Sequence, residues 1–525
     1  MRADQIKNRK DRTIYRLLEI LPGFLSWGVL LGSTILSFVE PVWVAIFIIC
    51  FDVYWLIKVL YLAVYLLVSY RRLKKNEKEP WLKNCNKIKV TDLPSSSDSG
   101  RQSRPKFEEI HHLVIIPMVF EDVDIVRQTF QALINSNYPK DKMIVVLATE
   151  ERAGVWAEKV ADQIRGEFGD KFFHFAVTKH PDNIVGELKG KGSNETWAAK
   201  EIRKFIDEKG FTYESVITSV FDVDTCVHPE YFGILTYKFL TVEDHLHASF
   251  QPVPMFFNNL WDSPALMRIV AMSTTFWMLM EQGRPEKLYT FSSHSMNFKT
   301  LVEVGYWETD VVSEDSRIFW QCFNFYNGNY RCEPLLIPVY MDTVLAGTFW
   351  QSVVNQYKQQ RRWAYGAENI PYVLTRFAKN KKMSFFKKID HGFWVVEGML
   401  SWATNSIIIF LAGWLPLFVG GEAFSKSLLA QNLPYVTQIL MTLAMLGMIV
   451  SATLSMFMLP PRPKRHGQHK ILFMLLQWIL LPISTICLGS FPALDAQTRL
   501  MFGKYMGFWV TEKARKRDDD VKKQN

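Results

Sequence analysis

The chain has 525 residues, of which 49% are hydrophobic and 22% charged, with a formal net charge of +9. This composition excludes a largely disordered protein. The six cysteines are too sparse for a disulfide scaffold, show no metal-ligand spacing, and indicate reduced thiols in a cytoplasm-facing protein. Much of the basic charge lies beside apolar runs, which is typical of membrane-flanking segments rather than of a nucleic-acid-binding surface.

Two apolar runs, 19–39 and 41–69, come first along the chain. Each is long enough for a transmembrane helix, which needs about 20 apolar residues. The basic residues on both flanks predict a cytoplasmic N-terminus and a cytoplasmic segment after Tyr70. No small-residue cleavage site follows the first run, so we interpret 1–70 as a cytoplasmic N-terminus with two transmembrane helices. A basic, serine-rich linker is expected over 71–106.

The stretch 107–370 alternates buried strands with helix-like segments and predicts one large α/β domain. Strands are expected at 112–117, 143–148, 172–177 and 215–221, with helices at 123–135, 153–168 and 196–209. The alternation indicates a parallel sheet that is covered on both faces. Ligands of such sheets bind at the carboxyl ends of the strands, so the polar residues that follow the strands are the candidate site.

Asp222 and Asp224 follow the fourth predicted strand. In an extended segment their side chains point to one face, where they can present two carboxylates to one divalent cation. The alternative is a solvated loop.

Two further segments are candidate nucleotide contacts. Glu150, after the second strand, can hydrogen-bond a base or ribose, or can cap the next helix. Lys191 lies in a basic, glycine-containing segment, 188–194, that is expected to be flexible and able to approach phosphate.

Two motifs lie near the end of this domain. Ser313-Glu314-Asp315 provides either a helix cap or a general base for a hydroxyl nucleophile. In Gln359-Gln360-Arg361-Arg362-Trp363, an arginine beside a tryptophan can bind a pyrophosphate and stack on a sugar ring. An exposed basic helix face is the alternative interpretation.

Three more apolar runs follow, at 393–420, 433–459 and 471–491. Three crossings would place the C-terminus outside, whereas its six Lys and Arg residues between 513 and 523 favour the cytoplasm. Two interpretations would give an even number of crossings. Pro482 and Pro492 can split the last run or make it re-entrant. Alternatively, the run 393–420, which contains Glu397, lies partly in the membrane interface.

Taken together, these motifs resemble those of membrane-embedded family 2 glycosyltransferases, similar to the cellulose, glucomannan, chitin and hyaluronan synthases. The order of Asp222-x-Asp224, Ser313-Glu314-Asp315 and Gln359-x-x-Arg362-Trp363 matches that family, and Phe508-Trp509-Val510-Thr511-Glu512-Lys513 is similar to its gating loop, Phe-x-Val-Thr-x-Lys. The resemblance covers about 107–513.

The resemblance implies a GT-A fold: a cytoplasmic α/β domain with a Rossmann-like mixed sheet, inserted between N- and C-terminal transmembrane helices in the plasma (inner) membrane. It implies interface and transmembrane helices over 371–495, and a gating-loop-like motif with a basic cytoplasmic tail over 496–525. The stretch 264–282, which Arg268 and Glu281 bracket, would be an in-plane interface helix.

The resemblance also implies a role for each motif residue. Asp222 and Asp224 would contact the nucleotide and its Mg²⁺ or Mn²⁺, and Asp315 would be the general base. Trp363 and Glu314 would bind the acceptor. The remaining nucleotide contacts would be Glu150, Lys191, Gln359, Arg362, Thr511 and Lys513.

The implied activity is inverting transfer from a UDP- or GDP-sugar to a hydroxyl acceptor, as a processive synthase that elongates a glycan across the bilayer. Accessory subunits are compatible with it, and nucleic acid is not expected as a partner. One alternative is a non-processive transferase with a lipid-linked acceptor; another is a non-catalytic transporter or scaffold that binds nucleotide sugar. The chain departs from the family pattern at Thr149-Glu150-Glu151, where aspartates are usual, and in having only five clear spans.

Overall fold

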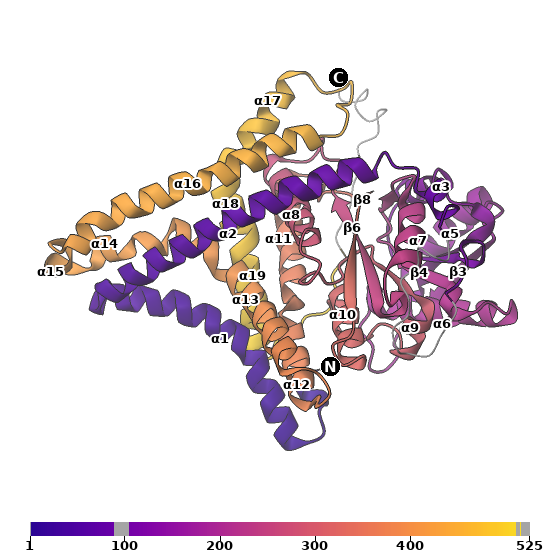
Figure 1. Ribbon diagram of the computed structural model, residues 1–525, viewed down its shortest axis with the longest axis horizontal. Coiled ribbons are helices and arrows are strands. Elements are labelled where there is room, and N and C mark those ends of the chain that lie inside the picture. Colours follow the sequence, from indigo (N-terminus) through magenta and orange to yellow (C-terminus); the bar gives the residue numbers. More distant parts are fainter. Residues whose placement is uncertain (1, 89–103, 511–514, 516–525) are drawn as a thin grey trace.

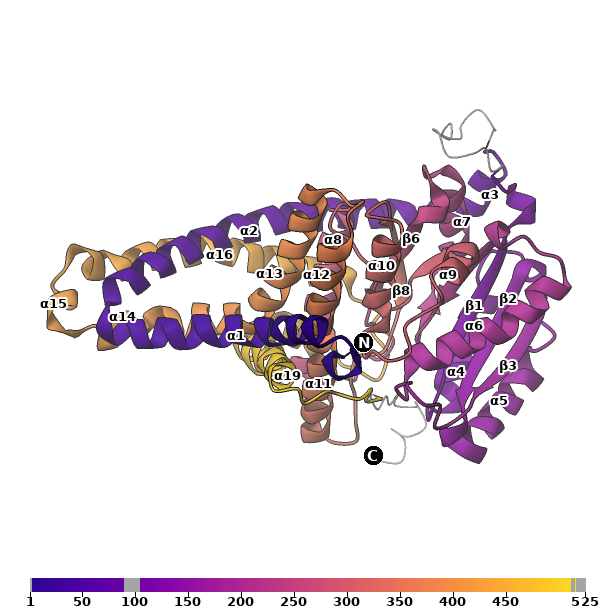
Figure 2. The same ribbon diagram turned by 90° about the horizontal axis from the view of Figure 1, so that it is seen from below.

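The computed structural model describes residues 2–88, 104–510 and 515. An α/β domain forms one end of the molecule, and long helices from both ends of the chain project away from it (Figures 1 and 2). The helices that precede the sheet or cover it are α1 (Arg9–Val39), α2 (Pro41–Asn76), α3 (Trp81–Cys85), α4 (Val123–Ile134), α5 (Gly154–Phe168), α6 (Lys191–Glu208), α7 (Tyr231–Thr241), α8 (Ala265–Gln282), α9 (Phe298–Glu303) and α10 (Glu314–Phe325).

The C-terminal part of the described chain is helical. Its helices are α11 (Phe349–Ala364), α12 (Asn369–Lys379), α13 (Phe385–Phe410), α14 (Leu415–Val419), α15 (Gly421–Ser425), α16 (Leu428–Met458), α17 (His469–Leu476), α18 (Leu481–Thr485) and α19 (Phe491–Met501).

The sheet has eight strands in the order β3-β2-β1-β4-β7-β6-β8-β5. The strands are β1 (His111–Pro117), β2 (Met143–Glu150), β3 (His174–His180), β4 (Val216–Val220), β5 (Cys226–Val227), β6 (Ala248–Met255), β7 (Ser295–Asn297) and β8 (Arg331–Tyr340). The predicted α/β mixed sheet with helical segments at both ends is confirmed. The alternation indicated a wholly parallel sheet, but the sheet is mixed. Strands β3, β2, β1 and β4 are parallel and β6 is parallel to β8, whereas β7 pairs antiparallel with both β4 and β6.

Helices cover both faces of the sheet, and strand β1 shows why its sequence is an unbroken apolar run. Leu113 and Ile115 belong to a core cluster with α6 and α10, whereas Val114 and Ile116 belong to a second cluster with α4, α5 and α7. Alternate side chains of a strand point to opposite faces, so both sets must be apolar.

Helix α6 begins at Lys191, not at 196 as predicted, so the expected flexible segment 188–194 is in large part the first turn of a helix. The physical reason is close packing at Gly192. A Cβ atom there would lie 2.9 Å from Cβ of Glu314, so the glycine allows this turn to pack directly on α10. Other expected boundaries move less: the third strand begins at His174 rather than at 172.

Five helical segments are long and apolar enough to span a membrane: Arg9–Val39, Pro41–Asn76, Phe385–Phe410, Leu428–Met458 and His469–Met501. The predicted continuous run 393–420 is wrong, because α13 begins at Phe385 and ends at Phe410. Pro416 lies at the start of the separate helix α14, and a proline has no backbone N–H with which to continue the preceding helix.

The last apolar run is one continuous helical segment, His469–Met501, whose helix type changes along its length. Pro482 and Pro492 each lie in the first turn of an α-helical part of it, α18 and α19. In Figure 1, α17, α18 and α19 follow one another from top to bottom, across the direction of α2 and α16.

The segment His469–Met501 packs against two other helices at the boundary of the α/β domain. Arg268 of α8 donates to Oε1 of Gln477 at 2.6 Å, and Arg361 of α11 pairs with Asp495 at 2.8 Å. Helix α8 itself is the stretch expected to lie in the membrane plane, and both of its bracketing charges, Arg268 and Glu281, are buried in the described structure.

Candidate active site

The ammonium group of Lys191 is the centre of the site. Its Nζ lies 2.7 Å from Oδ1 of Asp315 and 3.0 Å from Oδ1 of Asp222. It also lies 3.4 Å from Oε1 of Glu195 and 3.9 Å from Oε1 of Glu314. Two carboxylates that are far apart in sequence, Asp222 and Asp315, therefore converge on one cation.

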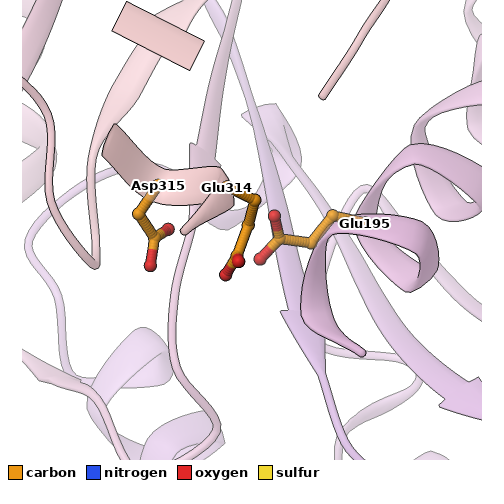
Figure 3. A group of neighbouring side chains, drawn as sticks. All are labelled: Glu195, Glu314 and Asp315. Atoms are coloured by element: carbon orange, nitrogen blue, oxygen red, sulfur yellow. The ribbon is translucent and has the colours of Figure 1, made fainter. Parts of the chain in front are cut away.

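Three elements bring these groups together. Asp222 follows the end of β4, Lys191 and Glu195 lie one turn apart on α6, and Glu314 and Asp315 are the first residues of α10. Figure 3 shows the Glu195 side chain reaching from its own helix toward Glu314 and Asp315. Since β4 belongs to the parallel half of the sheet, the site lies at the carboxyl end of a strand, where α/β domains bind ligands.

Glu195 is the site residue that the sequence analysis missed. Its side chain is fully buried, and neither carboxylate oxygen has a hydrogen-bond partner among the described residues. No signal in the sequence pointed to it, because the helix was predicted to begin at 196; in the structure Glu195 lies four residues after Lys191 on α6, on the same helical face. Ligand oxygens of Glu195, Glu314 and Asp315 all lie within 4.8 Å of one another.

Burial controls protonation here. Burial, reinforced by the charge of Asp315, raises the pKa of Glu314 to about 8. Burial also raises the pKa of Glu195 well above its ordinary value, although Lys191 acts in the opposite direction. For Lys191 itself burial would lower the pKa, but Asp222 and Asp315 outweigh it and hold the pKa well above its ordinary value. The site at neutral pH thus has charged Lys191 between two acids that favour their protonated forms.

His294 lies beside Asp315, with 3.7 Å between Nδ1 and Oδ1. Burial lowers the pKa of this imidazole to about 4, so it is neutral at pH 7. Nδ1 lies 3.0 Å from the carbonyl of Phe291, and Nε2 accepts a hydrogen bond from the indole N–H of Trp307 at 3.3 Å. These contacts match the neutral tautomer that carries its proton on Nδ1.

Asp224 is buried and faces different neighbours from Asp222. Its Oδ2 accepts the backbone N–H of Asp342 at 2.8 Å, and the carboxylate of Asp342 pairs with Arg515 at 2.6 Å. The extended geometry assumed for Asp222 and Asp224 does not occur, because the backbone turns there and Thr225 N–H donates to the carbonyl of Asp222.

The loop that carries Ser313 and leads into α10 is held by one carboxylate, that of Glu368. Its Oε1 accepts from the backbone N–H of Val312 at 2.9 Å, the N–H of Ser313 at 3.0 Å and the Ser313 hydroxyl at 2.8 Å. Ser313 therefore precedes the helix without capping it by its side chain. Glu368 lies just beyond the Gln-x-x-Arg-Trp helix and connects that motif to Glu314 and Asp315.

The residues of the Gln-x-x-Arg-Trp motif do not form an exposed basic face. Gln359 is buried, and the guanidinium carbon of Arg362 lies 4.7 Å from the ring centroid of Phe508. Trp363 packs on Phe256, with 6.2 Å between ring centroids. Phe508 also lies against Gly190, where a Cβ atom would be 2.7 Å from it, so the described part of the gating-loop-like motif lies between the Lys191 segment and α11. Thr511 and Lys513 lie outside the described residues.

Glu150 ends β2 and pairs with Arg152 at 2.5 Å. It does not cap α5, whose N-terminal residue follows Ala153. Glu150 and Arg152 line a small pocket with His180 and Glu187, which are 2.9 Å apart. This pocket lies at the carboxyl ends of β2 and β3.

The chain is similar in sequence to a curated protein. No protein-family model matches the chain. Over 271 residues the chain is 23% identical to a Bacillus subtilis (strain 168) protein named "Probable glycosyltransferase YdaM". The matched region covers 50% of this chain and 56% of that protein, so the chain spans little more than half of its relative's length.

Two solved structures are similar at low overall agreement. The mannosyltransferase PcManGT of Pyrobaculum calidifontis, in complex with GDP-Man and Mn²⁺, is 14% identical with a TM-score of 0.38, over 77% of this chain and 98% of that chain. TarS 1–349 of S. aureus, in complex with UDP-GlcNAc, is 12% identical with a TM-score of 0.31, over 63% of this chain and 91% of that chain. The described chain has a mixed α/β sheet and membrane-type helices at both ends, and half of it is similar in sequence to a protein named a probable glycosyltransferase.

Proposed function

We propose that the protein is a membrane-embedded glycosyltransferase that transfers a sugar from a nucleotide-sugar donor to a hydroxyl acceptor, with inversion at the anomeric carbon. The observation that carries the proposal is the convergence of Asp222 and Asp315 on Lys191 at the carboxyl end of β4. A site that joins a cation with two partly exposed carboxylates and two buried acids suits a substrate with a diphosphate leaving group and a hydroxyl nucleophile.

Asp315 is the proposed general base. Its carboxylate would accept the proton of the acceptor hydroxyl while the new glycosidic C–O bond forms and the bond from the anomeric carbon to the diphosphate breaks. The nucleoside diphosphate leaves with the bonding electron pair. His294 is unsuited to this role because burial keeps its pKa at about 4 and Trp307 already donates to its Nε2.

Lys191 and Arg362 are the proposed contacts to the donor diphosphate. Lys191 lies at the centre of the site, and Phe508 connects Arg362 to it, because its ring lies against Arg362 and also abuts Gly190. The pocket at Glu150 and Arg152 is the proposed site of the base or ribose, because it lies at the carboxyl ends of the neighbouring strands β2 and β3. Asp222, Gln359, Thr511 and Lys513 complete the proposed set of nucleotide contacts.

Acidic residues beside the proposed nucleotide site are the proposed ligands of a divalent cation. Asp224 and Asp342 are buried next to each other and offer only oxygen ligands, which Mg²⁺ and Mn²⁺ prefer. We propose Asp224, with Asp222 and Asp342 near it, as the residues that would hold such an ion. When bound, the ion would offset the charge that develops on the departing diphosphate.

Trp363 and Glu314 are the proposed acceptor-binding groups. An acceptor site at this position would lie between α11 and α10, on the side of the domain that faces the long helices (Figure 1). Aromatic rings bind the apolar faces of sugars, which supports a glycan acceptor and repeated transfer. We therefore propose a processive synthase of the plasma (inner) membrane with a cytoplasmic α/β domain.

The deciding experiment measures release of nucleoside diphosphate by the purified full-length protein in nanodiscs. UDP-glucose, UDP-N-acetylglucosamine and GDP-mannose are each supplied with Mg²⁺ or Mn²⁺, and then with a chelator. We expect release from at least one donor, loss of it with the chelator, and a fall of at least about 10³-fold in Asp315→Asn with donor binding retained. Asp170→Asn, an exposed acid on the surface, is the matched control.

Two results would contradict parts of this proposal. Folded wild-type protein that releases no nucleoside diphosphate from any donor is a binding protein rather than a transferase. Product that carries a single added sugar on a lipid, instead of a polymer, excludes processive synthesis but leaves the transfer chemistry in place.

A further inference from the structure

An open groove lies between the end of α16 and the start of α17, away from the active site residues. Its walls are Met456 of α16 and three α17 residues, Ile471, Leu472 and Leu475. Two polar residues of the connecting loop, Arg462 and Gln468, complete the lining. Leu472 is 57% exposed, so the apolar wall is accessible from outside the protein.

The groove lies at the level where the membrane-type helices meet the α/β domain. Helix α16 is one of the candidate spans, and it ends at Met458. Met458 and Leu454 pack with Met255 and Leu260 of the α/β domain in one core cluster. The groove therefore begins beside the last turn of a candidate span, on the side where the α/β domain lies.

The loop is fixed to the α/β domain by some of its basic residues. The indole N–H of Trp261 donates to the carbonyl of Pro460 at 3.1 Å, and Asp262 pairs with Arg465 at 2.6 Å and with His466 at 2.9 Å. Arg462 and Lys464 make no ion pair with a carboxylate of the described residues, and Arg462 donates to the backbone carbonyl of His466. They remain available to an anion.

Apart from Asp262, which pairs with Arg465 and His466, the charge of the groove's own chain segment is positive. The chain contains no Asp or Glu between Glu422 and Asp495, whereas the loop and the first turn of α17 contain Arg462, Lys464, Arg465 and Lys470. The groove thus combines basic residues of the loop with exposed apolar side chains of α17, close to the membrane boundary. This combination is complementary to a lipid with an acidic headgroup and acyl chains.

We propose that this groove binds an acidic phospholipid, with the headgroup phosphate at Arg462 and Lys464 and an acyl chain along Ile471, Leu472 and Leu475. The proposal does not depend on glycosyl transfer, since it concerns a surface outside the proposed active site. A soluble headgroup alone would lack the apolar contacts and would bind weakly.

The test measures which lipids the full-length protein retains. Purified protein is equilibrated with mixed micelles of phosphatidylcholine and phosphatidylglycerol in equal amounts, purified again, and its bound lipid is quantified by mass spectrometry. We expect several-fold enrichment of phosphatidylglycerol on the wild-type protein, lost roughly tenfold in the double variant Arg462→Gln, Lys464→Gln. Leu472→Asn should also lower the enrichment, although the basic loop is intact.

The matched control is the double variant Lys381→Gln, Lys382→Gln, which removes the same charge at exposed lysines before another candidate span, α13. Enrichment should persist in this control and in excess sn-glycerol 3-phosphate. The proposal is wrong if Arg462→Gln, Lys464→Gln retains full enrichment, if the control loses as much, or if the soluble phosphate displaces the lipid. Size-exclusion chromatography of each variant checks that it is folded.

Discussion

The buried ammonium of Lys191 faces more negative charge than it can neutralise. Asp222, Asp315, Glu195 and Glu314 all lie within 4 Å of its Nζ. Leaving all four ionised in a buried site would cost much free energy, so two of them, Glu195 and Glu314, favour the protonated form. The other two residues, Asp222 and Asp315, are partly exposed and can reach a substrate.

The raised pKa of Glu314 predicts a pH dependence of stability. Its pKa rises from an ordinary 4.5 to about 8 on folding, so its contribution is fully present below pH 4.5 and is lost as pH rises through 8. His294, with its pKa lowered from 6.5 to about 4, acts in the opposite direction only below about pH 6.5. Between pH 6.5 and 8, therefore, thermal unfolding temperatures should fall with rising pH.

Glu314→Gln should flatten this decline, because glutamine cannot ionise. Differential scanning fluorimetry of both proteins across pH 6–9 measures the two slopes. Parallel slopes in variant and wild type would show that Glu314 does not titrate in this range.

Glu368 is predicted to position Asp315 without touching substrate. Glu368→Ala removes three hydrogen bonds to the loop before α10, and we expect kcat to fall roughly 10- to 100-fold with little change in the donor KM. Glu368→Gln keeps one carbonyl oxygen as acceptor and should restore most of kcat. Steady-state kinetics of both variants tests this, and equal loss in the two would argue against a positioning role.

At the scale of elements, the site depends on close contact between α6, α10 and α11. Gly192 allows the first turn of α6 to meet Glu314, and Glu368, just after α11, holds the loop before α10. Helix α11 is in turn held by α19 through Arg361 and Asp495. The proposed catalytic groups are thus positioned by packed helices of the membrane-proximal part as well as by the sheet.

Helix α1 packs on α19 and so connects the N-terminal helices to the helices that hold the site. Ser26 donates to Gln497 at 2.6 Å, and Trp27 donates to Thr498 at 2.8 Å. At Gly23 the two helices are closer still, since a Cβ atom would lie 2.9 Å from both the carbonyl oxygen of Gln497 and Cβ of Met501.

Gly23→Ala should therefore separate α1 from α19 and destabilise the protein by about 1–3 kcal/mol. Gly28→Ala in the same helix is the matched control, because a Cβ atom there has nothing within 4 Å. We expect a lower unfolding temperature for the first variant only. If both behave alike, the contact at Gly23 is not tight in the folded protein.

At the scale of the whole molecule, the arrangement of helices bears on how the protein lies in a membrane. Helices α1, α2, α13 and α16 extend away from the α/β domain, whereas α17, α18 and α19 run across them beside it (Figures 1 and 2). We infer four crossings, with the fifth candidate segment in the interface. An even number places both ends of the chain on the side of the α/β domain, in agreement with the basic tail.

This topology predicts that the turn at α15 lies on the opposite side of the membrane from the α/β domain. In a variant without the exposed cysteines Cys50 and Cys487, Glu422→Cys should react with a membrane-impermeant thiol reagent added outside intact cells, and Lys382→Cys should react only after permeabilisation. Labelling of Lys382→Cys in intact cells would reverse the inferred orientation.

The sequence by itself determined the features that are local or periodic. Apolar runs identified the membrane-type segments, and unbroken apolar strands identified the buried sheet, because backbone hydrogen bonding and hydrophobic burial act on neighbouring residues. It also drew attention to Asp222 and Asp315 through their spacing and the family resemblance. It missed Glu195, placed the start of α6 too late and treated the Gln-x-x-Arg-Trp helix as an exposed face in one interpretation.

Only the tertiary structure decided which distant groups meet. Lys191 pairs with Asp222 and Asp315, which lie on separate elements. Glu368 accepts a hydrogen bond from the Ser313 hydroxyl, and Asp224 accepts one from the backbone of Asp342. Each of these contacts joins residues that are far apart in sequence. The direction of α17–α19 across the other helices is likewise a property of packing, since apolar composition is the same for a helix that crosses a bilayer and for one that lies against a domain. Composition sets whether a residue is buried, but the partner that it meets there depends on how the elements pack.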